Sequence, residues 1–325
     1  RRSFLSTLWN VYSFYVLYAN VDGFDPEQHQ LDVSRRSLLD KWIISRFNGL
    51  SAKVRSELDE YNITSAARAI EEFVDDLSNW YVRRSRRRYW GAEMTEDKVA
   101  AYLTLHEMLV GVAKLLAPFT PFVAEEVYRN LEGERRKDAP ESVHLCDYPK
   151  CDETLVDSEL ERDMAFVRNV VTLGRAARNR VNIKNRQPLA EMVVVAGSPE
   201  GERAVTALEP LIREELNVKV VRVASDTGEF VTHKVKPRYD LLGPKHGKLV
   251  KEVVAALLAM DPEEAVREMD RAGKVDVLVG GSAVQVNRDE VSVETVEREG
   301  YAVESEGGVS VALDTRLTPE LVMEG

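Results

Sequence analysis

The residues with the clearest chemical potential are arginines gathered between residues 79 and 90. They are Arg83, Arg84, Arg86, Arg87 and Arg88, with no acidic residue among them. Guanidinium groups bind phosphate through paired donors, and aromatic side chains can stack on bases or brace arginine stems. The aromatic neighbours are Trp80, Tyr81, Tyr89 and Trp90. The stretch therefore predicts an anion-binding helix end that faces RNA.

An amphipathic pattern leads into these arginines and predicts the helix that positions them. Its apolar residues are Ala66, Ile70, Phe73, Leu77 and Tyr81, spaced by three or four. If the helix continues, Arg83 and Arg87 share one line and Arg84 and Arg88 a second, so the fan cannot all be buried. The alternative is a solvated face in which the arginines pair with acids of the same helix. Those acids are Glu71, Glu72, Asp75 and Asp76.

Two further basic stretches supply secondary candidates on an acidic background. The first contains Arg168, Arg175, Arg178, Arg180, Lys184 and Arg186, and the candidates are Lys184 and Arg186 in the polar loop 182–189. The second spans 231–251, with Lys245 and Lys248 in the glycine-containing loop 241–248. Turn chemistry and domain packing explain the glycines and prolines of these loops equally well. Because the net charge is −11, local basic tracks favour a defined nucleic-acid path over indiscriminate coating.

No catalytic, cofactor or metal site is predicted. None of the five histidines lies in a recognised catalytic or metal-ligand context. His106 is predicted to be a core or interface residue, whereas His233 and His246 are either phosphate contacts or exposed. Cys146 and Cys151 fit neither a disulfide framework nor a four-ligand zinc site. With no apolar run of about 20 residues and no signal pattern, a cytoplasmic protein without membrane contact is expected.

The element pattern predicts an α+β protein, an antiparallel helical bundle over 1–181 followed by a smaller mixed α/β domain over 182–325. The bundle helices are expected at 1–20, from Ser34 to about 58, from Thr64 through the arginines, at 97–117, from Thr120 to Gly133, and from Ser158, with Glu161 completing a capping box. A surface loop is expected over 132–140.

In the second half, helices are expected at 198–217, at 248–259 and from Asp261. The expected strands are 191–196, 219–224, 274–279, 283–286, 291–296 and 309–313. Gly280 and Gly281 join two strands and predict a turn rather than a phosphate-binding loop. Residues 318–325 begin a helix that is cut short, so the second domain is expected to be truncated at its end.

Several of these stretches resemble the isoleucyl-tRNA synthetases, members of the class I aminoacyl-tRNA synthetases. The likeness covers essentially the whole chain, and its most distinctive part is 77–90. The other similar stretches are 8–14, 18–23, 116–122, 183–189, 242–245 and 321–325.

This resemblance implies a C-terminal anticodon-binding portion that positions tRNA(Ile) for a catalytic domain upstream. The parent enzyme would use ATP and magnesium, would carry an editing domain and is expected to be a monomer. The catalytic signatures His-Ile-Gly-His and Lys-Met-Ser-Lys-Ser are absent from these 325 residues, and the two cysteines do not match the family's zinc module.

A competing interpretation is a scaffold without RNA contact. In that case the bundle holds a partner protein or the parent catalytic core, and the arginines serve internal ion pairs. Arginine side chains mostly paired with carboxylates would favour the scaffold, whereas a continuous positive track across all three basic stretches would favour tRNA.

Overall fold

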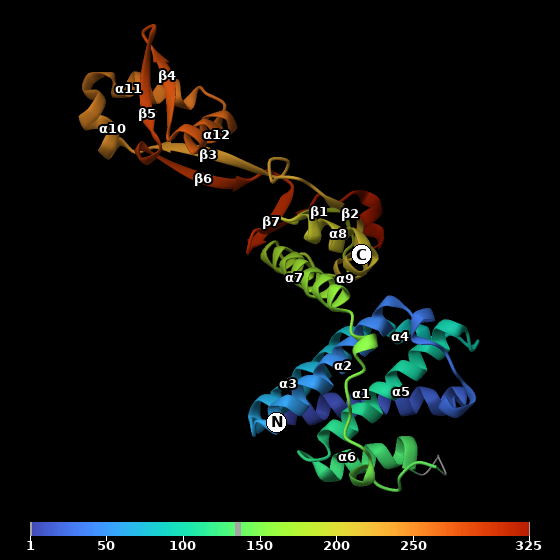
Figure 1. Ribbon diagram of the computed structural model, residues 1–325. Helices are drawn as coiled ribbons and strands as arrows, with labels where there is room; N and C mark the ends of the chain where they lie inside the picture. The colour runs from blue at the N-terminus through green and yellow to red at the C-terminus, as the bar shows by residue number, and fades with distance from the viewer. Residues whose placement is uncertain (1, 134–137, 325) are drawn as a thin grey trace. The chain divides into compact units, whose positions relative to one another are not determined.

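The structure, a computed structural model, describes residues 2–133 and 138–324. They form two compact units, Arg1–Arg162 and Asp163–Gly325, which can be followed by colour in Figure 1. The described strands all belong to the second unit, so the predicted α+β class with a helical bundle is confirmed. Most of α7 (Ser158–Arg180) lies in the second unit, and the domain division at residue 181 stays a prediction.

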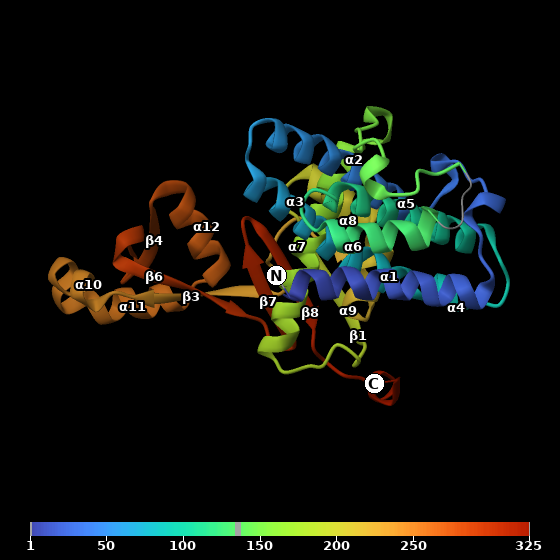
Figure 2. The ribbon, with the colours of Figure 1, turned by 90° about the horizontal axis from the view of Figure 1, so that it is seen from below.

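The first unit is a bundle built around the apolar helix α5 (Glu96–Leu116). By length and composition α5 could cross a bilayer. However, 83% of its most apolar 18-residue stretch is buried inside the structure, as expected of a central bundle helix. The helices that pack against it are α1 (Arg2–Asp22), α2 (Leu38–Asp59), α3 (Ile63–Asp76), α4 (Arg83–Trp90) and α6 (Pro121–Tyr128). Figure 2 shows α1 and α6 beside α5.

The arginine helix is not a regular continuation of α3. Residues Leu77–Val82 form a π-helical segment between α3 and α4. Hydrogen bonds from i to i+5 wind the chain more slowly than those of an α-helix. The faces of α4 therefore cannot be obtained by extending the 3.6-residue period of α3.

The predicted start of the second helix was wrong. Ser34 lies in a 3-10 turn, and α2 is capped by Ser37 instead. The Ser37 hydroxyl accepts a hydrogen bond from the Asp40 backbone, and the Asp40 carboxylate accepts one from the Ser37 backbone at 3.0 Å. This reciprocal pair is a capping box, and it places Asp40 in the first turn of α2.

Two other predicted caps also need correction. Thr120 precedes α6 but makes no capping side-chain bond. The predicted box of Ser158 and Glu161 does not form, because the Asp157 carboxylate accepts from the Leu160 backbone and Glu161 accepts from a serine of α2. Of the predicted loop 132–140, residues 134–137 lie outside the described residues, and Glu132 is buried in a π-helical turn.

The second unit contains a four-stranded sheet in the order β2-β1-β8-β7. Its strands are β1 (Leu189–Val195), β2 (Val218–Val223), β7 (Tyr301–Glu306) and β8 (Val309–Asp314). β1 and β2 are parallel, and the other pairs are antiparallel. The β1–β2 connection holds α8 (Pro199–Ala207) and α9 (Glu209–Leu216), and α13 (Pro319–Glu324) follows β8.

A two-stranded ribbon carries a smaller lobe of the second unit, as Figures 1 and 2 show. The ribbon pairs β3 (Val231–Pro237) with β6 (Val291–Glu297). The lobe contains α10 (Tyr239–His246), α11 (Val250–Leu258), α12 (Pro262–Ala272) and the hairpin of β4 (Lys274–Val279) and β5 (Ser282–Asn287). Gly280 and Gly281 join the hairpin with positive φ, so the predicted turn is confirmed.

Three features of this unit differ from the prediction. The helix expected over 198–217 is broken into α8 and α9, because Pro210 stands in the first turn of a new helix. Strands β3 and β7 were not predicted. The expected loop 241–248 is mostly helical, since α10 runs to His246 and Leu242 is buried in the lobe core.

Arg178 fixes the end of α7 and the loop that follows it. Its guanidinium is buried and donates to the carbonyls of Lys184, Gln187, Leu216 and Asn217. Burial lowers the pKa of Arg178 to about 10, so the side chain is charged at neutral pH. The carbonyls at the end of α9 lack helical partners, and Arg178 satisfies them. This arginine is structural.

The buried carboxylate of Asp40 holds the arginine helix in the bundle. Arg88 donates two hydrogen bonds to it, at 2.8 and 2.7 Å, and Tyr81 donates a third at 2.6 Å. Arg88 also binds Asp97 of α5 at 2.8 Å. Burial alone would raise the pKa of Asp40, but the hydrogen bonds and charge of Arg88, helped by Tyr81 and Ser37, hold that pKa below its ordinary value. The ion pair thus joins α2, α4 and α5.

We predict that Asp40→Asn lowers the free energy of unfolding by about 3–5 kcal/mol, because Arg88 keeps its buried charge without its main partner. The pKa of Asp40 is lower in the folded than in the unfolded chain, so the stabilisation is complete above about pH 4 and is lost as pH falls further. Urea unfolding between pH 3 and 7 measures both effects. Asp97→Asn, an exposed partner of Arg88, is the control and should cost at most about 1 kcal/mol. Equal losses would contradict the prediction.

A second prediction concerns Arg178→Met, which should cost about 3 kcal/mol because four carbonyls lose their charged donor. Amide hydrogen exchange in 182–188 should become faster. Arg186→Met changes an exposed arginine of the same loop and should stay within about 0.5 kcal/mol of wild type. Unchanged exchange in Arg178→Met would show that the loop does not depend on this side chain.

Candidate nucleic-acid interface

The helix that carries the arginines presents one apolar face to the core, as predicted. Ala66, Ile70, Phe73, Leu77 and Tyr81 are all fully buried. Tyr89 continues the buried side into α4, and its hydroxyl donates to the carbonyl of Ala101 in α5 at 2.9 Å. Both ends of the arginine stretch are therefore anchored, which leaves the rest of α4 to face outward.

The five arginines fall into three groups. Arg83, Arg86 and Arg87 are exposed, Arg84 is half-buried, and Arg88 is committed to Asp40 and Asp97. Arg83 donates its Nε to the carbonyl of Asn79. Within residues 2–133 and 138–324, Arg86 and Arg87 make no ion pair.

The carboxylates that hold Arg88 come from other helices of the bundle. Arg88 pairs with acids, as the scaffold interpretation requires, but these acids lie on α2 and α5 and not among the predicted partners on α3. One of those predicted partners, Asp76, binds Arg46 of α2 at 3.1 Å. The candidate interface thus consists of the exposed arginines Arg83, Arg86 and Arg87, hereafter the arginine face.

The two candidate tryptophans have different environments. Trp80 is 8% exposed and Trp90 is 62% exposed. Trp80 can therefore brace the π-helical segment, but its ring is withdrawn from a ligand. Trp90 donates its indole N–H to the hydroxyl of Tyr18 at 3.1 Å, which holds the ring at the surface beside the arginine face. Of the two, Trp90 is the one placed to stack on a base.

The end of α4 is held by a buried lysine that the sequence did not predict. Lys98 of α5 donates its ammonium to the carbonyl of Gly91 and pairs with Asp22, both at 2.6 Å. Tyr102 donates to the same carboxylate at 2.5 Å. Burial raises the pKa of Asp22, but Lys98 and Tyr102 outweigh it and lower the pKa below its usual range. A lysine in the first turn of an apolar helix carries no sequence signal for this role.

The secondary candidates all lie in the second unit and are carried by different parts of it. Lys184 and Arg186 are exposed on the loop before β1. Lys248 is exposed in the lobe, whereas Lys245 binds Glu290 at 2.8 Å and the carbonyl of Gln285. Lys245 is therefore partly neutralised, and the structure does not gather these four cations into one cluster.

Other charges of the basic stretch 231–251 are also paired. Lys236 binds Glu294 at 2.5 Å, and Arg238 binds Asp240 at 3.0 Å. His233 is half-buried and faces Glu263 at 2.8 Å, and a contact with phosphate stays a prediction. His106 is buried, as predicted, and faces Glu132 at 3.4 Å. Most of these partners come from distant parts of the chain, so the local sequence could not reveal them.

The described part of the chain offers no group of three or more His, Cys, Asp or Glu side chains arranged to hold a metal ion. Cys146 and Cys151 are both free. The arginine face can bind an extended anion, because its guanidinium groups are held in position beside an exposed indole.

Comparison with known proteins agrees with this arrangement. A family described as the anticodon-binding domain of tRNA ligase matches residues 40–194, which include the arginine face. Proteins named isoleucine–tRNA ligase match over the whole chain, with 43% identity in Clostridium tetani, 44% in Clostridium acetobutylicum and 42% in Porphyromonas gingivalis.

The chain spans 31% of the length of the two clostridial proteins and 28% of the Porphyromonas protein. The identity extends through both units, including the second unit beyond residue 194. The chain belongs to the isoleucine–tRNA ligase family, and its residues 40–194 match the anticodon-binding domain of tRNA ligases.

Proposed function

We propose that the chain binds tRNA through the arginine face of α4, as the tRNA-binding part of an isoleucine–tRNA ligase. The observation that carries this proposal is that the arginines of one stretch have two different roles. Arg88 anchors the helix to buried Asp40, while Arg83, Arg86 and Arg87 stay exposed beside Trp90. Because α4 is anchored, its exposed guanidinium groups can bind phosphates without the entropy cost of ordering a mobile segment.

The specific partner in this proposal is tRNA(Ile), contacted along its anticodon arm. The parent enzyme would attach isoleucine in an ATP-dependent, magnesium-requiring reaction carried out by a catalytic domain outside these 325 residues. Its editing domain would also lie outside them, and the enzyme would act in the cytoplasm as a monomer. The role of this chain is to position the tRNA.

The charge distribution supports RNA over the scaffold interpretation. A scaffold that uses its arginines internally would pair them with carboxylates, as Arg88 does. Arg86 and Arg87 instead make no ion pair in the described ranges, so on a chain of net charge −11 they form a local positive patch that a polyanion can bind. Lys184, Arg186 and Lys248 supply further exposed cations in the second unit, and Lys245 remains a secondary candidate.

The test is a salt titration of tRNA(Ile) binding to the full chain and to the triple variant Arg83→Gln, Arg86→Gln, Arg87→Gln. We expect the variant to bind about tenfold to a hundredfold more weakly at low salt. The slope of log affinity against log salt should become shallower by about three, one for each lost phosphate contact.

The matched control removes three exposed cations elsewhere on the α2–α3 pair, with Lys53→Gln, Arg55→Gln and Arg68→Gln. It changes net charge equally and should keep most of the affinity and slope. If both triple variants lose affinity equally, binding is general electrostatic attraction. If neither loses affinity, the arginine face is not the interface.

The exposed indole gives a separate prediction. Trp90→Ala should weaken tRNA binding by about 1–3 kcal/mol if a base stacks on the ring, whereas Trp90→Phe should retain a substantial part. The salt slope should stay that of wild type in both variants, because no cation is removed. Equal binding by Trp90→Ala and wild type would show that Trp90 is only a surface brace.

A further inference from the structure

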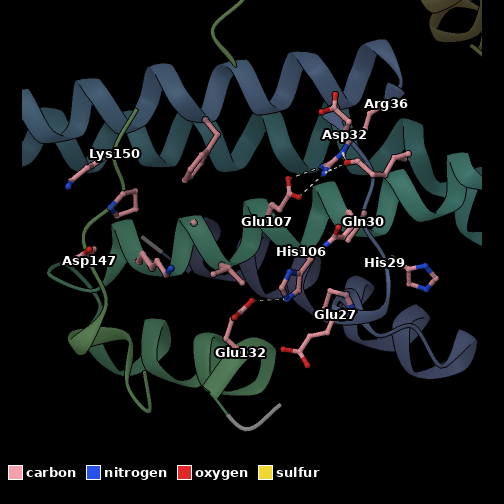
Figure 3. A pocket seen from close by; sticks show the side chains of 18 of the residues that line it. Glu27, His29, Gln30, Asp32, Arg36, His106, Glu107, Glu132, Asp147 and Lys150 are labelled. Carbon is pink, nitrogen blue, oxygen red and sulfur yellow. Dashed lines mark hydrogen bonds and ion pairs between the residues drawn. The ribbon is translucent and has the colours of Figure 1, made fainter. Parts of the chain in front are cut away.

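A second candidate site lies in the first unit, in a cleft of about 1270 Å³. Figure 3 shows its lining from close by. The floor is a face of α5, one wall is the segment 26–36 before α2, and the other wall is the segment 147–150. No residue of the arginine face lines this cleft.

The floor of the cleft is a stripe of α5. Leu103, Val110, Gly111 and Lys114 follow one another along it, and the twelve residues from Leu103 to Lys114 span about 16 Å. A Cβ at Gly111 would clash with the ring of Phe47. The bare glycine backbone therefore lets Phe47 pack close against α5 and form part of an apolar floor.

One end of the cleft is acidic and rigid. Arg36 and Glu107 form a double hydrogen bond with both distances at 2.8 Å. Two more carboxylates, Asp32 and Glu27, line the cleft; Figure 3 shows Asp32 near this pair and Glu27 on the other side of His106, toward Glu132. Hydrogen bonds from Ser34 lower the pKa of Asp32, so it is ionised at neutral pH.

The other end carries two lysines and one carboxylate, that of Asp147. Lys114 projects from α5 and Lys150 from the segment 147–150, and Figure 3 shows Lys150 far from Asp32. Neither lysine makes an ion pair within the described ranges. Tyr148, which also lines this end, donates its hydroxyl to the carbonyl of Leu115 at 3.0 Å. That bond fixes the segment against α5, so the two lysines at this end are carried by two elements held together.

The lining as a whole disfavours nucleic acid. Five carboxylates face three Lys or Arg side chains, the acids being Glu27, Asp32, Glu107, Glu132 and Asp147. A phosphate chain would meet this excess of negative charge along most of the cleft. The arrangement suits a ligand that is cationic at one end, apolar in its middle and anionic at the other end.

We propose that this cleft binds an extended peptide segment of a partner protein. At about 3.3 Å per residue, the floor of about 16 Å accommodates about five residues. A basic side chain lies at the Glu27 and Asp32 end, apolar side chains cover Phe47 and Val110, and a carboxylate lies between Lys114 and Lys150. The complementary charges at the two ends determine the direction of the bound segment.

The test uses three pools of fluorescein-labelled pentapeptides and the full 325-residue chain. The central positions of every pool are mixtures of Leu, Ile, Val and Phe. The first pool has lysine before and glutamate after them, the second has the reverse order, and the third has glutamine at both ends. Fluorescence anisotropy should show one bipolar pool binding at least about tenfold more tightly than the glutamine pool.

Charge reversal identifies the site. The double variant Lys114→Glu, Lys150→Glu should bind the preferred pool at least about tenfold more weakly than wild type does. It should instead bind a fourth pool with lysine at both ends, which wild type binds poorly. Lys53→Glu with Arg68→Glu reverses two exposed cations that do not line the cleft and should bind as wild type does. Circular dichroism melts check that the variants are folded.

Three results would overturn the proposal. The first is equal binding of the bipolar and glutamine pools. The second is unchanged binding of the preferred pool by the Lys114→Glu, Lys150→Glu variant with no gain for the lysine-ended pool. The third is complete displacement of the peptide by an unlabelled oligouridine, which would assign the cleft to RNA.

Discussion

The contact between Arg88 and Asp40 holds together the end of the first unit that carries the arginine face. The carboxylate is buried in the first turn of α2 and accepts hydrogen bonds from Arg88, Tyr81 and Ser37. An ionised group withdrawn from water persists only if such partners replace its hydration. Because these partners come from separate elements, the capped end of α2, the π-helical segment and α4 are held in one arrangement. The outward direction of the other arginines follows from that arrangement.

Basic residues in this chain serve two purposes that composition does not distinguish. Arg88, Lys98 and Arg178 are internal, and each satisfies backbone or carboxylate oxygens that would otherwise be buried without a donor. Arg86 and Arg87 make no ion pair in the described part of the chain, and they remain available to a ligand. The same stretch of α4 thus contains both the anchor and the binding group.

The central helix α5 supports two surfaces of different chemistry. Near its start, Asp97, Lys98 and the carbonyl of Ala101 hold α4 through Arg88, Gly91 and Tyr89. Further along, its face from Leu103 to Lys114 forms the floor of the mixed-charge cleft. A long buried helix suits both tasks, because side chains on one rigid element keep their spacing. A polyanion is therefore favoured at one place in the bundle, and a ligand with charges of both signs at another.

Local patterns in the amino-acid sequence predicted the fold class and most of the helices and strands, and the resemblance of several stretches predicted the family. The apolar spacing from Ala66 to Tyr81 predicted the buried face of the arginine helix, and Gly280 with Gly281 predicted a hairpin turn. Both signals are local, because helix periodicity and positive φ depend on neighbouring residues. The availability of each cation, in contrast, was settled by long-range packing. The Asp40 carboxylate reaches Arg88 across 48 residues of sequence, and Arg178 reaches Leu216 across 38. Such contacts leave no periodic trace in the residues that make them, because a charged side chain is buried or exposed according to what packs over it in the folded chain.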